Sequence, residues 1–311
     1  MRISGKARSI AASLPAALLV VALSAQTTKP ARINRAIDLL IQHQPVYYTG
    51  SHEGTEGSFA QGVKDAQTWA DYISYDMEHA PFDVKGLAEY MKGLVKGGPT
   101  RSGHRTPAVI VNVPVNGTDE ATVRANAWMF QQVLATGVHG VLLCHADEPG
   151  AARAFVEAVR FPANGGRRGV HGNSTAAQIW GISPDEYARR ADAWPLNPDG
   201  ELLLGLKLED QYALEHAEAS AKVRGIGFAE WGPSDMAFSL GVPYSSGPLP
   251  AALQAARAKV FAATKQSGIF FLNAVTPDDV VDMIKEGVMI GAANERAAEV
   301  GRRYTRRTMP W

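Results

Sequence analysis

The chain has 311 residues, of which 46% are hydrophobic and 20% are charged, and its formal net charge at pH 7 is +0. This composition is that of a globular protein with enough apolar material for one large core. The balanced charge, without a Lys/Arg-rich block, argues against a nucleic-acid partner. The single cysteine, Cys144, excludes an internal disulfide and a paired-cysteine metal site, and its apolar neighbours indicate a core residue.

The N-terminus has the three-part pattern of a secretory signal. Basic residues precede an apolar run over residues 10–25, which ends in small residues before a polar stretch. We therefore predict a signal peptide over residues 1–26, a mature domain over residues 31–311, and an exported protein that is periplasmic or secreted. The alternative is a membrane anchor. However, the run contains Pro15 and is shorter than the roughly 20 residues of a membrane span, so we expect no stable span after processing.

Eight short apolar runs bounded by turn residues predict β-strands. In chain order they cover residues 45–50, 72–79, 108–114, 140–146, 202–209, 225–232, 269–275 and 288–293. Segments of helical period alternate with them, at residues 83–95, 119–135, 150–161, 211–223 and 248–266, with a short helix at 183–194. This alternation predicts an α/β fold, a single-domain (β/α)₈ TIM barrel. A doubly wound open sheet is the alternative, but no GxGxxG sequence follows the first strand to support it.

Two segments lie outside this regular pattern. Residues 162–200 form the longest irregular stretch, which we interpret as an elaborated loop on the active face, since loops carry function in such folds. Residues 295–311 end in a basic, aromatic tail that either packs on a neighbouring subunit or frays. In a barrel, chemistry lies at the C-terminal ends of the strands, which directs the search for the site.

The second predicted strand ends in Asp76-Met77-Glu78-His79, followed by Pro81. Three ionisable side chains at a strand end are costly to place there by chance. His79 beside Asp76 would make a base oriented by a carboxylate, which could move protons near pH 7. The alternative is a solvated loop histidine.

Two later strand ends carry further charged residues. Alternation puts Lys207 and Glu209 on one face of the fifth strand and the adjacent leucines on the other, so the charges are expected to point into the barrel mouth. A structural Lys–Glu pair is the alternative. Asp235 follows a Gly-Pro turn and could be only a helix N-cap. With Glu209 one strand away, the two carboxylates could instead converge on a Mg²⁺-like or Mn²⁺-like cation.

Together these residues resemble the HpcH/HpaI aldolase family, also called the citrate-lyase-β-like or 2,4-dihydroxyhept-2-ene-1,7-dioate aldolase family. The strongest segments are YDMEHAPFD (75–83), LKLED (206–210) and GPSDMAFSLG (232–241). Weaker support comes from EPGAARAFVEAVRFP (148–162), GRRGV (166–170) and GIFFLN (268–273). The resemblance covers roughly residues 45–300, and the three strong segments are specific because they occur in the right order and spacing.

The resemblance implies a (β/α)₈ barrel that forms homotrimers or homohexamers and binds Mg²⁺, Mn²⁺ or Co²⁺. It implies a lyase that cleaves or forms a carbon–carbon bond between a pyruvate-like enolate and an aldehyde, with a small 2-oxo or hydroxy acid as substrate. The cation would act as a Lewis acid. Residue by residue, Glu209 and Asp235 match the metal carboxylates, and His79 with Asp76 matches the proton-transfer dyad. Gly232 and the amides of Ser234 and Asp235 match the site for the substrate carboxylate.

The sequence departs from the family pattern at three places. Asn112 stands where the family usually has an arginine that contacts the keto oxygen, and Lys207 stands where it tends to have glutamine. Lys207 could supply the missing charge as a catalytic residue, although lysine is a point charge rather than a fork. His145 follows the fourth strand where the family is usually apolar. It could be an extra base, a third metal ligand or a substrate contact, or it could have no role.

Three functions follow from these patterns. The first is a metal-dependent carbon–carbon lyase of the class II pyruvate-aldolase type. The second keeps the barrel and the metal but changes the reaction, to a hydratase or another lyase, and gains if Lys207 or His145 proves essential. The third is a non-catalytic carboxylate-binding relative, which the presence of both Asp76 and His79 disfavours.

Overall fold

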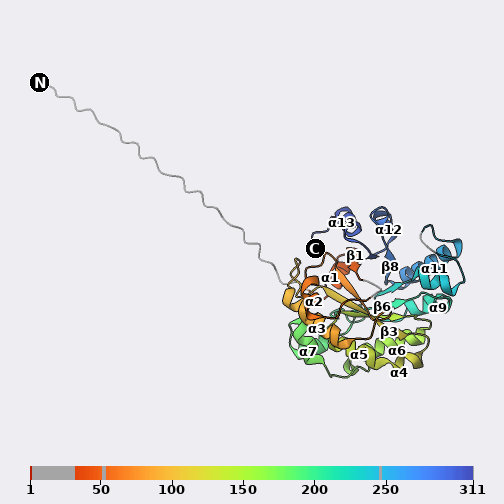
Figure 1. Ribbon diagram of the computed structural model, residues 1–311, viewed down its shortest axis with the longest axis horizontal. Coiled ribbons are helices and arrows are strands. Elements are labelled where there is room, and N and C mark those ends of the chain that lie inside the picture. Colours follow the sequence, from red (N-terminus) through yellow and green to blue (C-terminus); the bar gives the residue numbers. More distant parts are fainter. Residues whose placement is uncertain (2–31, 51–53, 245–246, 311) are drawn as a thin grey trace.

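The computed structural model describes residues 1, 32–50, 54–244 and 247–310, so the predicted signal peptide lies, apart from Met1, outside the described residues. Within them, parallel strands form a closed barrel surrounded by helices (Figure 1). The strand order is β4-β3-β2-β1-β9-β8-β7-β6-β5, and pairing between β4 and β6 closes the ring. The predicted (β/α)₈ barrel is therefore confirmed.

The barrel strands correspond to the eight predicted runs, and each is somewhat shorter than its run except β3, which extends two residues beyond it. They are β1 (Val46–Thr49), β2 (Tyr72–Asp76), β3 (Ala108–Asn116), β4 (Gly140–Cys144), β6 (Leu202–Lys207), β7 (Phe228–Glu230), β8 (Phe270–Ala274) and β9 (Ile290–Ala292). An additional strand of two residues, β5 (Ala193–Trp194), pairs with the start of β6.

Helices surround the ring of strands (Figure 1). Their bounds are α1 (Arg35–Ile41), α2 (Phe59–Asp65), α3 (Val84–Gly97), α4 (Glu120–Ala125), α5 (Ala127–Ala135), α6 (Pro149–Val159), η1 (Pro162–Asn164), α7 (Asn173–Trp180), α8 (Pro184–Arg190), α9 (Gln211–Ala221), α10 (Pro233–Ser239), α11 (Ala251–Ser267), α12 (Val280–Glu286) and α13 (Glu295–Tyr304). Among these described helices, none combines the length and the apolar composition needed to cross a bilayer.

The apolar side chains divide into two layers, as the alternation of strand residues requires. One cluster fills the barrel interior and includes Ile110, Leu142 and Phe228 from β3, β4 and β7, together with Ile37 and Leu40 of α1. Helix α1 therefore closes the N-terminal end of the barrel. The other cluster lies between the strands and the surrounding helices. Because apolar packing closes the N-terminal end of the barrel, we expect the polar groups of a site at the C-terminal end of the strands.

Two sequence-based expectations were wrong in detail. The predicted helix over residues 119–135 is interrupted at Asn126, whose side-chain amide donates to the carbonyl of Thr122 at 2.9 Å, so that α4 and α5 are separate. The segment 162–200 does not lie on the active face. It connects α6 to the start of β6, and the Trp180 indole donates to the carbonyl of Gly137, just before β4. A helix-to-strand connection runs to the N-terminal end of the next strand, away from the site.

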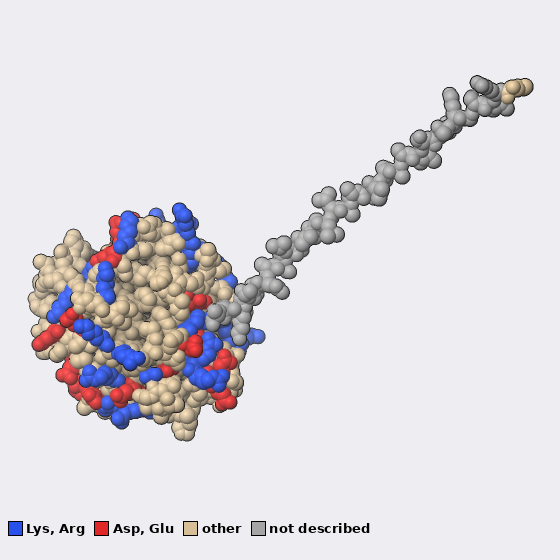
Figure 2. All heavy atoms as spheres, turned by 180° about the vertical axis from the view of Figure 1, so that it is seen from behind, with Lys and Arg blue, Asp and Glu red and all other residues tan. Residues whose placement is uncertain are grey.

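The C-terminal segment packs on its own barrel. Arg302 of α13 and Arg307 donate to the carboxylate of Asp71, which precedes β2, at 3.1 and 2.7 Å. Arg35 of α1 lies 3.2 Å from the same carboxylate. These side chains are buried, so the tail is anchored by a charged network rather than frayed. On the molecular face in Figure 2, acidic and basic side chains are interspersed.

Candidate active site

The ammonium group at the end of β6 and the carboxylate group two residues later point into the mouth of the barrel. Leu206 and Leu208 are fully buried in the outer layer, against the helices, as alternation predicts. Lys207 and Glu209 therefore face inward, and they are only 3% and 1% exposed. Burial of two charges is tolerated where each has a partner, so their neighbours define the site.

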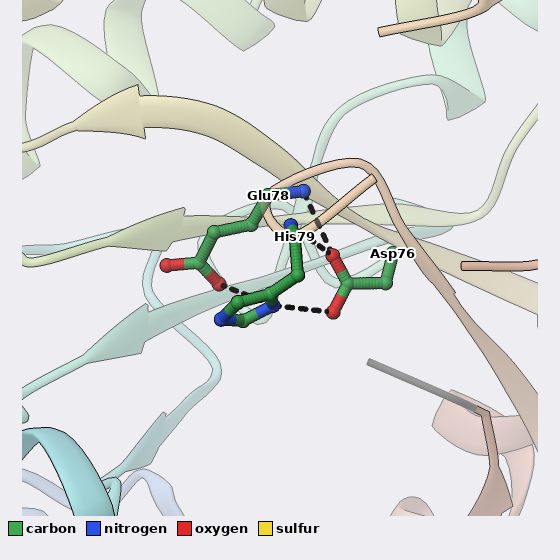
Figure 3. A group of neighbouring side chains, drawn as sticks. All are labelled: Asp76, Glu78 and His79. Carbon is green, nitrogen blue, oxygen red and sulfur yellow. Dashed lines mark hydrogen bonds and ion pairs between the residues drawn. The ribbon is translucent and has the colours of Figure 1, made fainter. Parts of the chain in front are cut away.

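A sharp turn after β2 brings Asp76 and His79 together. Oδ2 of Asp76 lies 2.9 Å from Nδ1 of His79, and Oδ1 accepts from the backbone amides of Glu78 and His79 at 2.8 and 2.9 Å. Figure 3 shows the His79 ring between the carboxylates of Asp76 and Glu78. Burial alone would raise the pKa of Asp76, but the hydrogen bonds from His79 hold that pKa below its usual value. Asp76 is thus an ionised group that orients the imidazole.

Lys207 links two carboxylates from different strands. Its Nζ lies 2.5 Å from Oε2 of Glu78 and 3.4 Å from Oε2 of Glu209. Burial alone would lower the pKa of Lys207, but the Glu209 carboxylate and other nearby acidic groups raise it well above its usual value. Burial raises the pKa of Glu209 to about 7, partly offset by the charge of Lys207. The lysine therefore carries the positive charge that allows both acids to lie inside the mouth.

His145 approaches the same two carboxylates from the end of β4. Its backbone has a φ of 44°, and its amide donates to Oε1 of Glu209 at 3.3 Å. Ring atom Nδ1 lies 3.3 Å from Oδ2 of Asp210, and Nε2 lies 3.8 Å from Oε1 of Glu78. The hydrogen bond to Asp210 raises the pKa of His145 to about 9 against the opposing effect of burial. Asp210 also caps α9, accepting from the amides of Tyr212 and Ala213, so its position is fixed.

The loop after β7 lies directly against Glu209. Gly232 has a φ of 46° and precedes α10, and a Cβ placed on it would lie 2.5 Å from Oε2 of Glu209. Only glycine fits both the backbone and the contact. Gly232, rather than Asp235, occupies the N-cap of α10, and Asp235 lies half-buried in the first turn with Ser234 exposed beside it.

Two adjoining cavities open at this end of the barrel. The first has a volume of about 370 Å³, and its lining includes His79, Lys207, Glu209, Ser234 and Asp235 together with Gly232. The second has a volume of about 300 Å³ and is lined in part by Asp76 and Asn112, which are register partners on β2 and β3. Tyr48 and Glu230 line both cavities. His145 lines neither cavity, but it contacts Glu78 and Glu209 of the site.

The donor set fits a divalent cation. Ligand atoms of Glu78, His145 and Glu209 all lie within 4.8 Å of one another, and so do those of a second group, Asp76, Glu78 and His79. Asp235 shares the cavity with Glu209 but belongs to neither group. Neither Glu78 nor Asp210 was assigned a role from the sequence. Glu78 could have been found from its position between Asp76 and His79 at the end of β2. Only the fold places Asp210 beside His145.

Comparison with known proteins shows the family to which the chain belongs. A model of the HpcH/HpaI aldolase/citrate lyase family matches residues 60–294. The chain belongs to this family.

Two aldolases are similar to this chain over part of their length. A hydroxypyruvate/pyruvate aldolase of Deinococcus radiodurans is 30% identical over 171 residues, which is 55% of this chain and 52% of that protein. A 2-keto-3-deoxy-L-rhamnonate aldolase of Klebsiella pneumoniae is 29% identical over 177 residues, or 57% of each chain. The match thus spans little more than half the length of these relatives.

A solved structure extends the likeness of fold to most of the chain. A HpcH/HpaI aldolase/citrate lyase family protein from Burkholderia cenocepacia J2315 superimposes with a TM-score of 0.63 at 22% identity, covering 85% of this chain and 92% of that one. At this identity the likeness concerns the fold alone.

Proposed function

We propose that the protein is a metal-dependent carbon–carbon lyase of the class II pyruvate-aldolase type, acting on a small 4-hydroxy-2-oxo acid. One observation carries the proposal. A histidine held by a carboxylate, His79 with Asp76, lines the same cavity as Glu209. The ligand atoms of Glu209 and Glu78 lie close enough together to hold a cation. Proton transfer and charge stabilisation are the two requirements of aldol cleavage.

His79 is the proposed base for the substrate hydroxyl. Asp76 engages Nδ1 at 2.9 Å, which favours the tautomer with its proton on Nδ1 and leaves Nε2 as the acceptor. In cleavage, Nε2 takes the proton of the 4-hydroxyl group, the C3–C4 bond breaks, and an aldehyde leaves. The electron pair of that bond passes to the 2-oxo unit as an enolate. Protonation of C3 then yields pyruvate.

Glu209, with Glu78 and the predicted ligand Asp235, would hold the cation, for which Mg²⁺, Mn²⁺ and Co²⁺ are the candidates. A bound divalent cation would supply Lewis-acid stabilisation of the negative charge that develops on the 2-oxo acid. Gly232 permits the loop carrying Ser234 and Asp235 to lie against Glu209, and this loop is the proposed place of the substrate carboxylate. Lys207 holds the two glutamates in place and adds positive charge near the developing enolate.

The proposal is tested by pyruvate release from 4-hydroxy-2-oxo acids. The chelator-stripped protein is assayed with and without Mg²⁺ or Mn²⁺, and Glu209→Gln and His79→Asn are compared with wild type. Glu218→Gln, at an exposed position of α9, is the matched control for the carboxylate change. Metal-dependent release that is lost in the first two variants and kept in the control supports the proposal. No release from any tested 4-hydroxy-2-oxo acid would refute the plain aldolase function.

A hydratase or another lyase on the same site is the second candidate. It is favoured by Asn112 of β3, which brings no positive charge to the cavity that it lines, and by Lys207, whose ammonium is already engaged by two carboxylates. The two functions differ in product. A hydratase adds water across the double bond of an unsaturated 2-oxo acid, so the ultraviolet absorbance of that substrate falls and no aldehyde forms.

Two further parts of the proposal concern the whole protein. We propose that the chain is exported after cleavage near residue 26, which N-terminal sequencing of the mature protein tests. We also propose a homo-oligomer, a trimer or hexamer. Phe238 on α10 is 91% exposed beside the candidate site and would be available for a subunit contact there. Light scattering on the purified protein tests the assembly.

A further inference from the structure

The two glutamates of the barrel mouth, buried Glu209 and half-buried Glu78, each present one oxygen to Lys207 and the other to His145. Oε2 of Glu78 and Oε2 of Glu209 face Nζ of Lys207 at 2.5 and 3.4 Å. Oε1 of Glu78 lies 3.8 Å from Nε2 of His145, and Oε1 of Glu209 lies 3.8 Å from Nδ1. The ammonium and the imidazole thus lie on opposite sides of the carboxylate pair. A cation on the His145 side would leave both contacts of Lys207 intact.

The orientation of the His145 ring fits a metal ligand. Asp210 lies 3.3 Å from Nδ1, and this carboxylate is itself held by the amides at the start of α9. A histidine that donates from one nitrogen to a carboxylate presents the lone pair of the other nitrogen to a metal. For His145 that nitrogen is Nε2, which faces Glu78.

The other carboxylate–histidine group is less suited to a cation. In the group of Asp76, Glu78 and His79, both oxygens of Asp76 already accept hydrogen bonds, from two backbone amides and from Nδ1 of His79 (Figure 3). Metal binding through Asp76 would break the dyad. Oε1 of Glu209, in contrast, accepts only a long bond of 3.3 Å from the His145 amide among the hydrogen bonds of the described residues.

We propose that His145 is a nitrogen ligand of the site cation, through Nε2, together with Oε1 of Glu78 and Oε1 of Glu209. This inference rests on the proposed function only in placing a divalent cation at this site. An imidazole with two carboxylates suits borderline first-row transition ions, whereas a set of oxygens alone suits Mg²⁺. The site therefore selects Mn²⁺, Co²⁺ or Zn²⁺ over Mg²⁺.

The test compares histidine-to-asparagine variants without any substrate. Asparagine is chosen because it tolerates positive φ better than most residues. His43 is the matched control, since it is exposed, has a φ of 55° and follows α1 at the closed end of the barrel. His79→Asn distinguishes the competing group. Circular dichroism confirms that each variant is folded before metal is added.

Two readouts decide the proposal. Electron paramagnetic resonance of one equivalent of bound Cu²⁺ should show coupling to one ring nitrogen in wild type, His43→Asn and His79→Asn, and none in His145→Asn. Calorimetric titration should show that His145→Asn weakens Co²⁺ binding by at least about tenfold, with Mg²⁺ binding changed much less. Nitrogen coupling that persists in His145→Asn, or disappears in His79→Asn, would overturn the proposal. Because no turnover is measured, failure of the aldolase assay leaves this result unaffected.

Discussion

Nζ of Lys207 lies 2.5 Å from Oε2 of Glu78, although the two residues come from different strands of the barrel. Replacing Lys207 by glutamine leaves the Glu78 and Glu209 carboxylates without their buried cation. We expect the metal-free protein to lose roughly 3 kcal/mol of unfolding free energy, as when one partner of a buried pair is removed. Urea unfolding with chelator and with Mn²⁺ measures the loss and its recovery by metal.

Divalent cation affinity should rise in Lys207→Gln by about tenfold or more, because a nearby unit positive charge is removed. Activity should nevertheless fall, since that charge also serves the developing enolate. If the variant binds metal more weakly than wild type, the proposal that Glu78 and Glu209 bind the metal beside Lys207 is contradicted.

The dyad of Asp76 and His79 should affect catalysis without affecting metal affinity. His79→Asn removes the base and should lower kcat by about 10²- to 10⁴-fold. Asp76→Asn should act similarly, because its amide would face Nδ1 of His79 and favour the tautomer with the proton on Nε2. Calorimetric titration with Mn²⁺ should be unchanged in both variants. A weakened metal titration in either variant would place the cation at the dyad instead.

The close contact of Gly232 with Glu209 provides a steric test of the site. Gly232→Ala and Gly241→Ala both place alanine at positive φ, 46° and 64°, and each should cost about 1–3 kcal/mol of stability through backbone strain. Only Gly232→Ala puts a Cβ 2.5 Å from Oε2 of Glu209, whereas Gly241 has open space around it. Metal affinity should therefore fall in the first variant alone. Equal metal affinity in both would show that Glu209 does not hold the cation.

A buried histidine away from the site predicts the pH dependence of stability. His139 is 1% exposed, and its Nδ1 accepts from the amide of Val109 at 3.1 Å. Burial, with a smaller effect of the charge on His104, lowers the pKa of His139 to about 3. The histidine of the unfolded chain takes up a proton near pH 6.5, whereas in the folded chain it stays neutral down to about pH 3. As the pH is lowered from 6.5 to 3, the free energy of unfolding therefore falls by about 1.4 kcal/mol per pH unit.

His139→Asn keeps an acceptor for the Val109 amide but cannot take up the proton. Urea unfolding at pH 7 and pH 5 should show wild type losing about 2 kcal/mol more than this variant over the interval. The loss of stability caused by the smaller side chain is the same at both pH values, so it cancels when the changes between pH 7 and pH 5 are compared. Parallel pH profiles for the two proteins would contradict the assignment.

The barrel could be predicted because its signals are local. Each strand is a short apolar run, and the order of runs and helices leaves few alternatives. The alternation within LKLED also predicted that Lys207 and Glu209 point inward. The placement of residues 162–200 was wrong because irregular composition indicates a loop but not the end of the barrel at which it lies, which connectivity decides.

The division of the carboxylate oxygens between Lys207 and His145 could not be predicted from the sequence. Glu78, His145 and Glu209 follow β2, β4 and β6, and only closure of the ring brings their side chains together. The anchoring of the C-terminal tail on Asp71 is similar, since Arg302 and Arg307 are far from Asp71 in the sequence.

Enolisation of pyruvate itself tests the central claim most directly, because it needs no knowledge of the natural aldehyde. Exchange of the methyl protons for deuterium in D₂O is followed by NMR after quenching with chelator. The account predicts exchange that requires both protein and a divalent cation, that is lost in Glu209→Gln and that is kept in Glu218→Gln. Exchange no faster than with the cation alone, or unchanged in Glu209→Gln, would contradict a metal-dependent pyruvate lyase.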